Sequence, residues 1–187
     1  MQVTGHRLFS TAIGPCGLAW GPGGIVAVQL PEPTEAATRE RMLKGLPRGH
    51  MLDPSAHDAV APPAIQAAVS GIQALLAGER RDLQELVLDM TGVSDFHQKV
   101  YAIARAIAPG QTRTYGDVAE ALGDKRWARA VGQALGANPF APVVPCHRVL
   151  AAGGRAGGFS AGGGTLTKLR MLEIEGAALG GTASLFD

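Results

Sequence analysis

The sequence predicts two structural parts: an α/β N-terminal domain, made of a small sheet with helices, and a mainly α C-terminal domain that contains a helix-turn-helix. Two short apolar runs flank a Gly-Pro-Gly-Gly turn at residues 21–24, which is typical of a β-hairpin. Residues 94–137 instead contain three segments with helical periodicity and short connections. At 187 residues the chain can form one domain or two small ones. We therefore expect domains at residues 1–90 and 94–178, followed by a flexible tail at 179–187.

The N-terminal half is predicted to contain this hairpin, with strands at residues 16–20 and 25–30. A helix should follow at residues 34–44, because Thr34 is a good N-cap and Gly45 is a good terminator.

Three further segments complete this half. A second helix is predicted after Pro62, because apolar side chains recur at helical spacing from there until Gly78. Residues 83–89 favour another strand, and residues 90–94 are the expected linker.

The C-terminal half begins with a predicted helix at residues 95–108, capped by Ser94 and ended by the Pro-Gly pair that follows it. Thr114 and Asp117 have the spacing of a capping box and should open a short helix that extends to Leu122. After a Gly-Asp turn, the third helix is predicted at residues 125–137.

The two faces of this third helix differ in chemistry. One face is apolar and is expected to be buried; it consists of Trp127, Ala130, Val131, Ala134 and Leu135. The other face carries Arg129, Gly132, Gln133 and Gly136. Glycine inside a helix costs about 1 kcal/mol relative to alanine, so two glycines on an exposed face need a reason. The close approach of a DNA backbone supplies one, and this helix is the candidate DNA-binding element.

Composition excludes several classes of protein. The two cysteines lie 130 positions apart with no Cys-x-x-Cys pair, so neither a disulfide framework nor a cysteine-based zinc site is predicted. His50 and His57 lie in a stretch punctuated by proline and glycine and are interpreted as solvated loop histidines rather than a metal pair. No segment reaches about 18 uninterrupted apolar residues. We expect a reduced, cytoplasmic protein without a metal and without a membrane partner.

The charge is divided unevenly along the chain. The net charge is +1, but residues 1–93 carry 7 Lys/Arg and 9 Asp/Glu, a balance of −2, whereas residues 94–187 carry 10 and 7, a balance of +3. The excess of positive charge therefore lies in the half with the helix-turn-helix pattern, which is compatible with a small DNA footprint.

The residues Pro145-Cys146-His147-Arg148 place a thiol beside an imidazole just after this pattern. A free thiol has a pKa near 8.5, so a neighbouring base is the usual means of making it a nucleophile at neutral pH. The tetrapeptide predicts a cysteine nucleophile, although such a pair can also be ordinary packing.

Several spaced motifs make the chain similar to a known family. From residue 94 to residue 177 it resembles the O6-alkylguanine-DNA alkyltransferases, also called methylated-DNA-protein-cysteine S-methyltransferases. The matching motifs are Thr114-Tyr115-Gly116, residues 128–132, Asn138-Pro139, residues 145–149, residues 157–160 and Glu175-Gly176. The resemblance implies a monomer without a cofactor that binds double-stranded DNA in the minor groove and flips out O6-alkylguanine. It also implies single-turnover, irreversible transfer of the alkyl group to Cys146, with O4 of thymine as a second candidate position.

The resemblance also implies a role for individual residues in catalysis. Cys146 would be the nucleophile, activated by His147 through a water molecule, while Glu175 would orient the imidazole. Spacing alone does not choose between Glu175 and Glu173, and the family match favours Glu175. Asn138 would tie its turn to the active-site segment.

Further roles concern DNA and the substrate pocket. Arg129 would fill the space of the flipped nucleotide, and Tyr115 would crowd the adjacent phosphate and read the guanine edge. The glycine-rich segment 153–164 would be the lid of the alkyl pocket, with Gly157 leaving room and Ser160 donating to the leaving O6. The resemblance also places Val149, Phe159 and Lys168 in the substrate pocket. It gives Pro145 and Arg148 a structural role.

Three features depart from the family pattern: Trp127 stands where a small residue is usual, Phe159 replaces a common tyrosine, and the segment Ala161 to Thr165, before Lys168, is longer in glycine than usual. Three other functions remain open from the sequence. A non-catalytic sensor of alkylated DNA would lack the cysteine, a helix-turn-helix regulator would need base-reading side chains, and a Cys/His hydrolase would not require DNA.

Overall fold

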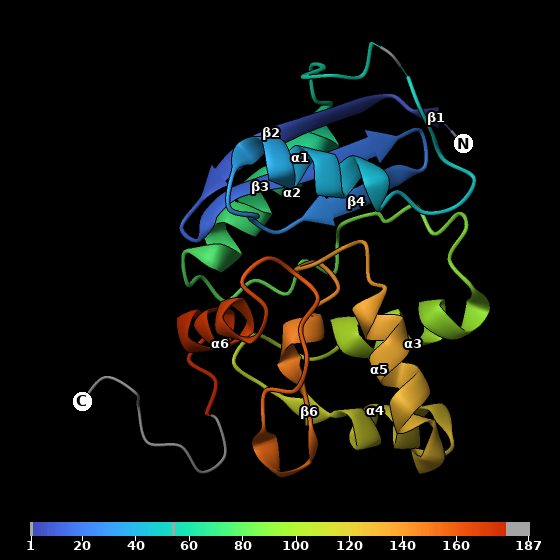
Figure 1. Ribbon diagram of the computed structural model, residues 1–187, viewed down its shortest axis with the longest axis vertical. Helices are drawn as coiled ribbons and strands as arrows, with labels where there is room; N and C mark the ends of the chain where they lie inside the picture. The colour runs from blue at the N-terminus through green and yellow to red at the C-terminus, as the bar shows by residue number, and fades with distance from the viewer. Residues whose placement is uncertain (1, 54, 179–187) are drawn as a thin grey trace.

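The computed structural model describes residues 2–53 and 55–178, so the predicted tail at 179–187 lies outside the described residues. An antiparallel sheet with the strand order β2-β3-β4 occupies one end of the molecule, and most of the helices occupy the other (Figure 1). The predicted hairpin is confirmed as β3 and β4, whereas β2 had no sequence prediction. The strands are β2 (Gly5–Thr11), β3 (Gly14–Gly21) and β4 (Gly24–Gln29), and a short parallel pair is formed by β1 (Gln2–Val3) and β5 (Met51–Leu52).

Two helices cover opposite faces of the sheet, α1 (Glu35–Lys44) and α2 (Pro63–Leu76) (Figure 1). Side chains of a strand alternate between its two faces, so Leu18 joins the large core with α2, while Ala19 packs with Met42 of α1. Both helices match their predicted positions, and the Thr34 side chain accepts from the Ala37 amide as the expected N-cap.

The strand predicted at residues 83–89 is wrong. Leu83 has a left-handed backbone (φ 56°), and the Leu86 amide donates back to the Leu83 carbonyl, so the segment bends where a strand would extend. Within this stretch, all of which the structure describes, Leu88 alone pairs with a strand, through one parallel bridge to Ile25. Leu83 and Leu86 are buried by turning inward rather than by pairing, whereas Val87 is 67 % exposed.

The prediction for His50 is also wrong. Its side chain is 0 % exposed, with Nε2 3.3 Å from Asp89 Oδ2 and Nδ1 3.2 Å from the Pro47 carbonyl oxygen. The loop around His50 folds back against residues 89–92, where a side chain on Gly92 would collide with the Arg48 carbonyl. His57, by contrast, is exposed as expected.

The C-terminal half is mainly helical, as predicted, and includes the helix-turn-helix pair α4–α5. The capping box of α4 is confirmed, because the Asp117 amide donates to Thr114 Oγ1 and the Thr114 amide donates to Asp117 Oδ2. The elements are α3 (Asp95–Arg105), β6 (Arg113–Thr114), α4 (Tyr115–Leu122), the 3₁₀ turns η1 (Lys125–Trp127), η2 (Cys146–Arg148) and η3 (Ala152–Gly154), and α5 (Ala128–Gly136), β7 (Val149–Leu150) and α6 (Thr165–Ile174).

The predicted burial of Trp127 is wrong. This residue ends η1, before the α-helix begins at Ala128, so its side chain leaves the apolar face of α5 and is 44 % exposed. Its ring rests edge-on against Phe96 of α3, with centroids 6.2 Å apart. Val131, Ala134 and Leu135 are buried as predicted; helix α3 is shorter than expected and ends at Arg105.

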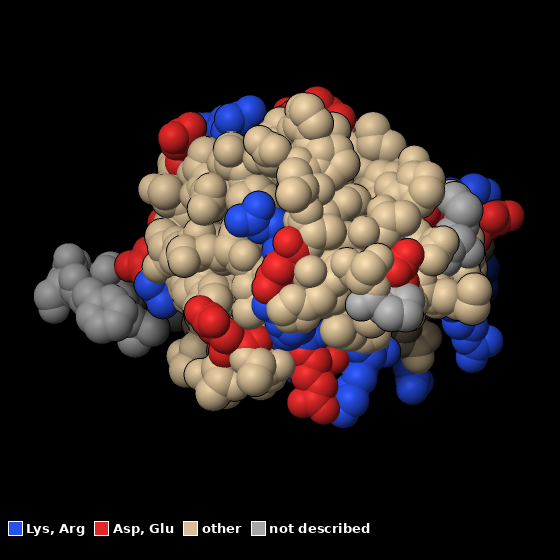
Figure 2. All heavy atoms as spheres, turned by 90° about the horizontal axis from the view of Figure 1, so that it is seen from above, with Lys and Arg blue, Asp and Glu red and all other residues tan. Residues whose placement is uncertain are grey.

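One large apolar core joins the two halves, because it includes Trp20 and Ile72 together with Val131 and Val144. The division into domains at residues 90–94 therefore stays a prediction. On the face that Figure 2 shows, the end formed by the N-terminal half, positive and negative side chains are interspersed. Within the described ranges, no helix is long and apolar enough to span a bilayer.

Candidate active site

Cys146 opens the turn η2, directly after the buried segment 140–145. Its side chain is nearly buried, at 8 % exposure, and lines two neighbouring cavities. The turn is held by Asn138, whose Nδ2 donates to the Val144 carbonyl at 2.8 Å and whose Oδ1 accepts from the Phe140 amide at 2.9 Å. The asparagine thus ties the end of α5 to the segment that carries the thiol.

His147, Arg148 and Glu175 form a buried charged cluster behind the thiol. Nε2 of His147 is 2.7 Å from Glu175 Oε1, and Arg148 donates through Nε and Nη2 to both oxygens of the same carboxylate at 2.9 Å. Glu175 also accepts from the Gly110 amide, while Arg148 donates to the Ile107 carbonyl. The fold therefore selects Glu175 as the partner of His147, whereas its neighbour Glu173 is exposed.

The two sides of the imidazole have different surroundings. Because the Glu175 carboxylate accepts a hydrogen bond at Nε2, the proton of a neutral His147 belongs on that nitrogen. Nδ1 is buried and has no hydrogen-bond partner among the residues that the structure describes. The neutral imidazole can therefore accept a proton at Nδ1, and the residue that precedes it in the chain is Cys146.

The predicted DNA-binding face of α5 lies outward. Arg129, Gln133 and Gly136 are exposed and Gly132 is partly exposed, while the opposite side of the helix is buried in the core. A Cβ atom at Gly132 would lie 3.9 Å from the Tyr115 ring, so the glycine leaves the space beside the tyrosine free of a side chain. Tyr115 itself is half-buried at the start of α4.

The glycine-rich segment 153–164, the predicted lid, lies beside the thiol, because Phe159 and Ser160 line both cavities together with Cys146. Gly157 has a left-handed backbone (φ 68°), and a side chain there would lie 3.4 Å from the Tyr115 ring. Ser160 is placed differently from the expectation, because its Oγ donates to the Gly136 carbonyl at 3.1 Å. The hydroxyl that was expected to donate to O6 thus donates to a carbonyl at the end of α5 in this structure.

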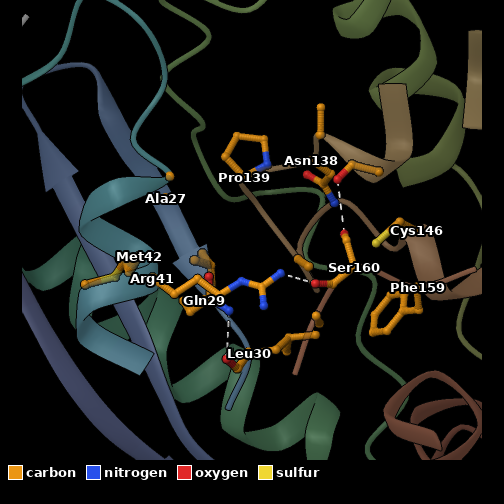
Figure 3. A pocket seen from close by; sticks show the side chains of 16 residues that line it. Ala27, Gln29, Leu30, Arg41, Met42, Asn138, Pro139, Cys146, Phe159 and Ser160 are labelled. Atoms are coloured by element: carbon orange, nitrogen blue, oxygen red, sulfur yellow. Dashed lines mark hydrogen bonds between the residues drawn. The ribbon is translucent and has the colours of Figure 1, made fainter. Parts of the chain in front are cut away.

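The two cavities meet at Cys146. One, of about 390 Å³, opens beside α5; its lining includes Tyr115, Gly132, Gly136, Gly158 and Phe159. The other, of about 200 Å³, lies between the sheet and the C-terminal half (Figure 3), and its lining includes Ala27, Leu30, Arg41, Met42 and Ser160. The first cavity lies beside Gly132 and Gly136 on the outward face of α5.

Similarity to known proteins agrees with this geometry. A family model described as 6-O-methylguanine DNA methyltransferase, DNA binding domain, matches residues 95–177. The methylated-DNA--protein-cysteine methyltransferase of Mycobacterium tuberculosis is 37% identical over 183 residues, which cover 97% of this chain and 98% of the relative. The chain belongs to the 6-O-methylguanine DNA methyltransferase family.

Solved structures of the family extend the similarity to the fold. Mycobacterium tuberculosis OGT in complex with DNA matches with a TM-score of 0.67 and 33% identity, covering 94% of this chain and 93% of that one. The O6-methylguanine-DNA methyltransferase of Pyrococcus kodakaraensis matches with a TM-score of 0.68 and 27% identity, covering 94% and 99%. Both matches span the N-terminal sheet as well as the methyltransferase half.

Burial sets the resting charge states of this methyltransferase site. Burial raises the pKa of the Cys146 thiol, against the opposing effects of Asn138 and Lys168. Burial also lowers the pKa of His147, although Glu175 acts in the opposite direction. The resting pair is therefore a thiol beside a neutral imidazole, and the thiol needs a base when it reacts.

Lys168 is a buried cation near the Cys146 thiol. It is fully buried in α6, and its Nζ donates to the Val149 carbonyl at 2.7 Å. The ammonium also lies over the rings of Tyr115, 5.7 Å from the centroid, and Phe159, 6.0 Å away. Burial lowers the pKa of Lys168 to about 8, so the side chain is mostly charged at neutral pH.

Residues that sequence reasoning missed support the site from a distance. Gly110 was expected only to end a helix, yet its amide binds Glu175, and Arg41 of α1 reaches the lid. Each lies more than 60 positions from its partner, so no local pattern indicates the contact.

The charged cluster predicts how the free energy of unfolding depends on pH. Burial alone would raise the pKa of Glu175, but hydrogen bonds from His147 and Arg148 outweigh it and lower the pKa from 4.5 to about 2. A carboxylate with a depressed folded pKa stabilises the fold above its unfolded pKa, and this contribution is lost as the pH falls from about 4.5 towards 2. The shift corresponds to about 3 kcal/mol. His147 also destabilises the fold as the pH falls below about 6.5, because the imidazole binds a proton more readily in the unfolded chain than in the buried site.

Urea unfolding between pH 7 and pH 3 measures this loss. The variant Glu173→Gln, which removes an exposed carboxylate two positions away, should follow the wild-type curve. A free energy of unfolding that stays constant between pH 5 and pH 3 would contradict the assignment.

Proposed function

We propose that this protein repairs DNA by transferring an alkyl group from O6 of guanine to Cys146, once per molecule. The observation that carries the proposal is the thiol at the wall of the cavity beside α5, backed by the buried pair His147–Glu175. Family membership supports the same activity, because the relatives are named for methyl transfer from DNA to a protein cysteine.

The chemical step is an in-line displacement. Cys146 Sγ attacks the alkyl carbon, a C–S bond forms, and the C–O6 bond breaks with its electron pair going to the guanine. The thiol proton passes to Nδ1 of His147, through a bridging water, while Glu175 holds the proton on Nε2 and stabilises the imidazolium. The guanine anion takes up a proton at N1 from water, which restores the normal base, and the imidazolium of His147 returns the thiol proton to solvent.

The charge that develops on the guanine has a partner in Lys168. Its ammonium is held between the Val149 carbonyl and the rings of Tyr115 and Phe159, so it is already oriented before the substrate arrives. A fixed cation in a dry site stabilises a developing anion without reorganisation at the moment of reaction. Ser160 adds a donor to O6 if its hydroxyl exchanges the Gly136 carbonyl for the substrate oxygen.

DNA is bound by the outward face of α5. O6 of a paired guanine lies inside the base stack, so the nucleotide must be flipped out to reach the enclosed thiol, at a cost of a few kcal/mol. Arg129 offsets this cost by occupying the vacated position, and the glycines of α5 allow the backbone to approach. Tyr115 directs the adjacent phosphate and contacts the guanine edge.

The product explains why turnover is not expected. A thioether is not reversed by the groups present in the site, so each molecule is consumed by one transfer. The only other cysteine in the sequence, Cys16, is buried in β3, and burial raises its pKa to about 12, so it should not compete for the alkyl group.

The proposal is tested with a duplex that contains one O6-methylguanine. Intact-mass and peptide-mass measurements should show a gain of one methyl group on Cys146, at most one per molecule, with guanine restored in the DNA. Tight binding to the duplex without any change in mass would overturn the transfer and leave a sensor of alkylated DNA.

The role of Arg129 predicts a separation between DNA and free-base substrates. Arg129→Ala should slow transfer from the duplex by about tenfold or more, because no side chain then occupies the position that the flipped nucleotide leaves in the base stack. Transfer from free O6-benzylguanine, which needs no flipping, should keep the wild-type rate. The control is Arg126→Ala, which removes an exposed arginine paired with Asp124. An equal loss of rate on the duplex and on the free base would instead show that Arg129 maintains the structure of the active site and does not act in flipping.

A further inference from the structure

The predicted lid, residues 153–164, makes contacts with the N-terminal half of the chain. Arg41 of α1 donates through Nη2 to the main-chain carbonyl of Ser160, and its Nη1 lies 2.8 Å from Glu32 Oε1. Figure 3 shows the guanidinium reaching from α1 to Ser160, with Cys146 on the other side of the serine. One side chain of the N-terminal half therefore touches a lid residue that lines both cavities together with Cys146.

A second contact lies two residues further along the lid. A side chain at Gly162 would collide with the Pro31 carbonyl oxygen and approach the Glu32 carboxylate, so the lid backbone lies directly against the segment that precedes α1. Glu32 is largely buried there, with 13 % of its side chain exposed. The carboxylate is thus fixed by its surroundings and can orient the arginine.

The lid needs such a support. Residues 153–164 include seven glycines, and glycine loses more conformational freedom on ordering than any other residue. Within the lid, Ser160 is held at two points: its carbonyl by Arg41 and its hydroxyl by the Gly136 carbonyl at the end of α5. The bond to Gly136 must break if the hydroxyl is to reach O6, whereas the bond to Arg41 can persist, because it uses the main chain.

We propose that Arg41 is a positioning residue for alkyl transfer, which holds the main chain of Ser160 so that the serine hydroxyl can turn between Gly136 and the substrate oxygen. The inference rests on the proposed function and assigns to the N-terminal half a part in the chemical step. Because α5 carries the DNA-binding face and Arg41 lies on α1, losing Arg41 affects the rate of transfer and leaves DNA affinity unchanged.

The test compares variants on the same helix. Arg41→Ala should lower the single-turnover rate at saturating methylated duplex by about tenfold, with the dissociation constant for unmodified duplex unchanged. Arg41→Lys should restore part of the rate, because lysine keeps a donor for the carbonyl but lacks the fork that also binds Glu32. The matched control is Arg39→Ala, whose arginine contacts Asp58 and His6 instead of the lid. Hydrogen exchange of the lid amides should increase in Arg41→Ala and not in Arg39→Ala.

Each alternative result has a defined meaning. A wild-type rate in Arg41→Ala, or an equal loss in Arg39→Ala, would overturn the proposal. A fall in DNA affinity that accounts for the slower transfer would make Arg41 a DNA contact and would overturn it as well. If the wild-type protein transfers nothing, the proposed function fails, and the hydrogen-exchange comparison still decides whether Arg41 holds the lid.

Discussion

Cys146→Ser is expected to abolish alkyl transfer while leaving DNA binding intact. A serine hydroxyl is nearly isosteric with the thiol, but it is far less acidic and less nucleophilic, so the neutral imidazole of His147 cannot activate it. The proposed DNA-binding face of α5 is separate from the side chain at position 146, because its exposed residues point away from the core. The measurement is the intact mass after incubation with methylated duplex, where wild-type protein gains about 14 Da and the variant gains nothing.

Binding of the same variant completes the experiment. Its affinity for methylated duplex should match or exceed that of the wild type for unmodified duplex, because the lesion stays in the pocket. Cys16→Ser is the control, since that thiol is buried away from the cavities and should leave the transfer unchanged. A methyl group found on any residue other than Cys146 would refute the assignment of the nucleophile.

Glu175→Gln is expected to have the second largest effect, on both stability and rate. The amide cannot balance Arg148, which is 1 % exposed, so a buried charge is left uncompensated at a cost of about 3–5 kcal/mol. The same change removes the carboxylate that holds the proton on Nε2 of His147, and Nδ1 is then no longer reliably the acceptor. Loss of an effective base should slow transfer by about 10²- to 10⁴-fold.

A double variant separates these two effects. Glu175→Gln combined with Arg148→Met removes both charges, so the free energy of unfolding should recover in part while the transfer rate stays low. Urea unfolding and single-turnover kinetics are measured on the same samples, with Glu173→Gln as the matched control. A double variant that regains the wild-type rate would show that Glu175 acts through stability alone.

Local signals in the sequence predicted most of the secondary structure. The caps Thr34 and Thr114 and the Gly-Pro-Gly-Gly turn involve residues within four positions of one another, and each forms as predicted. The errors concern segments whose conformation depends on distant partners. Residues 83–89 are apolar enough for a strand but bend at Leu83, where Arg105 of α3 binds their carbonyl groups. Trp127 ends a 3₁₀ turn before α5, and its ring rests on Phe96 of α3.

The sequence by itself indicated Cys146 as the candidate nucleophile and determined the helix-turn-helix and the family, because these depend on short motifs whose residues are neighbours in the chain. The tertiary structure decided what surrounds the nucleophile. It paired His147 with Glu175 rather than Glu173, placed the hydroxyl of Ser160 on Gly136, and brought Arg41 to the lid across 119 positions. The physical reason is that burial and hydrogen bonding depend on which distant segments the core brings together, and no local spacing specifies that contact.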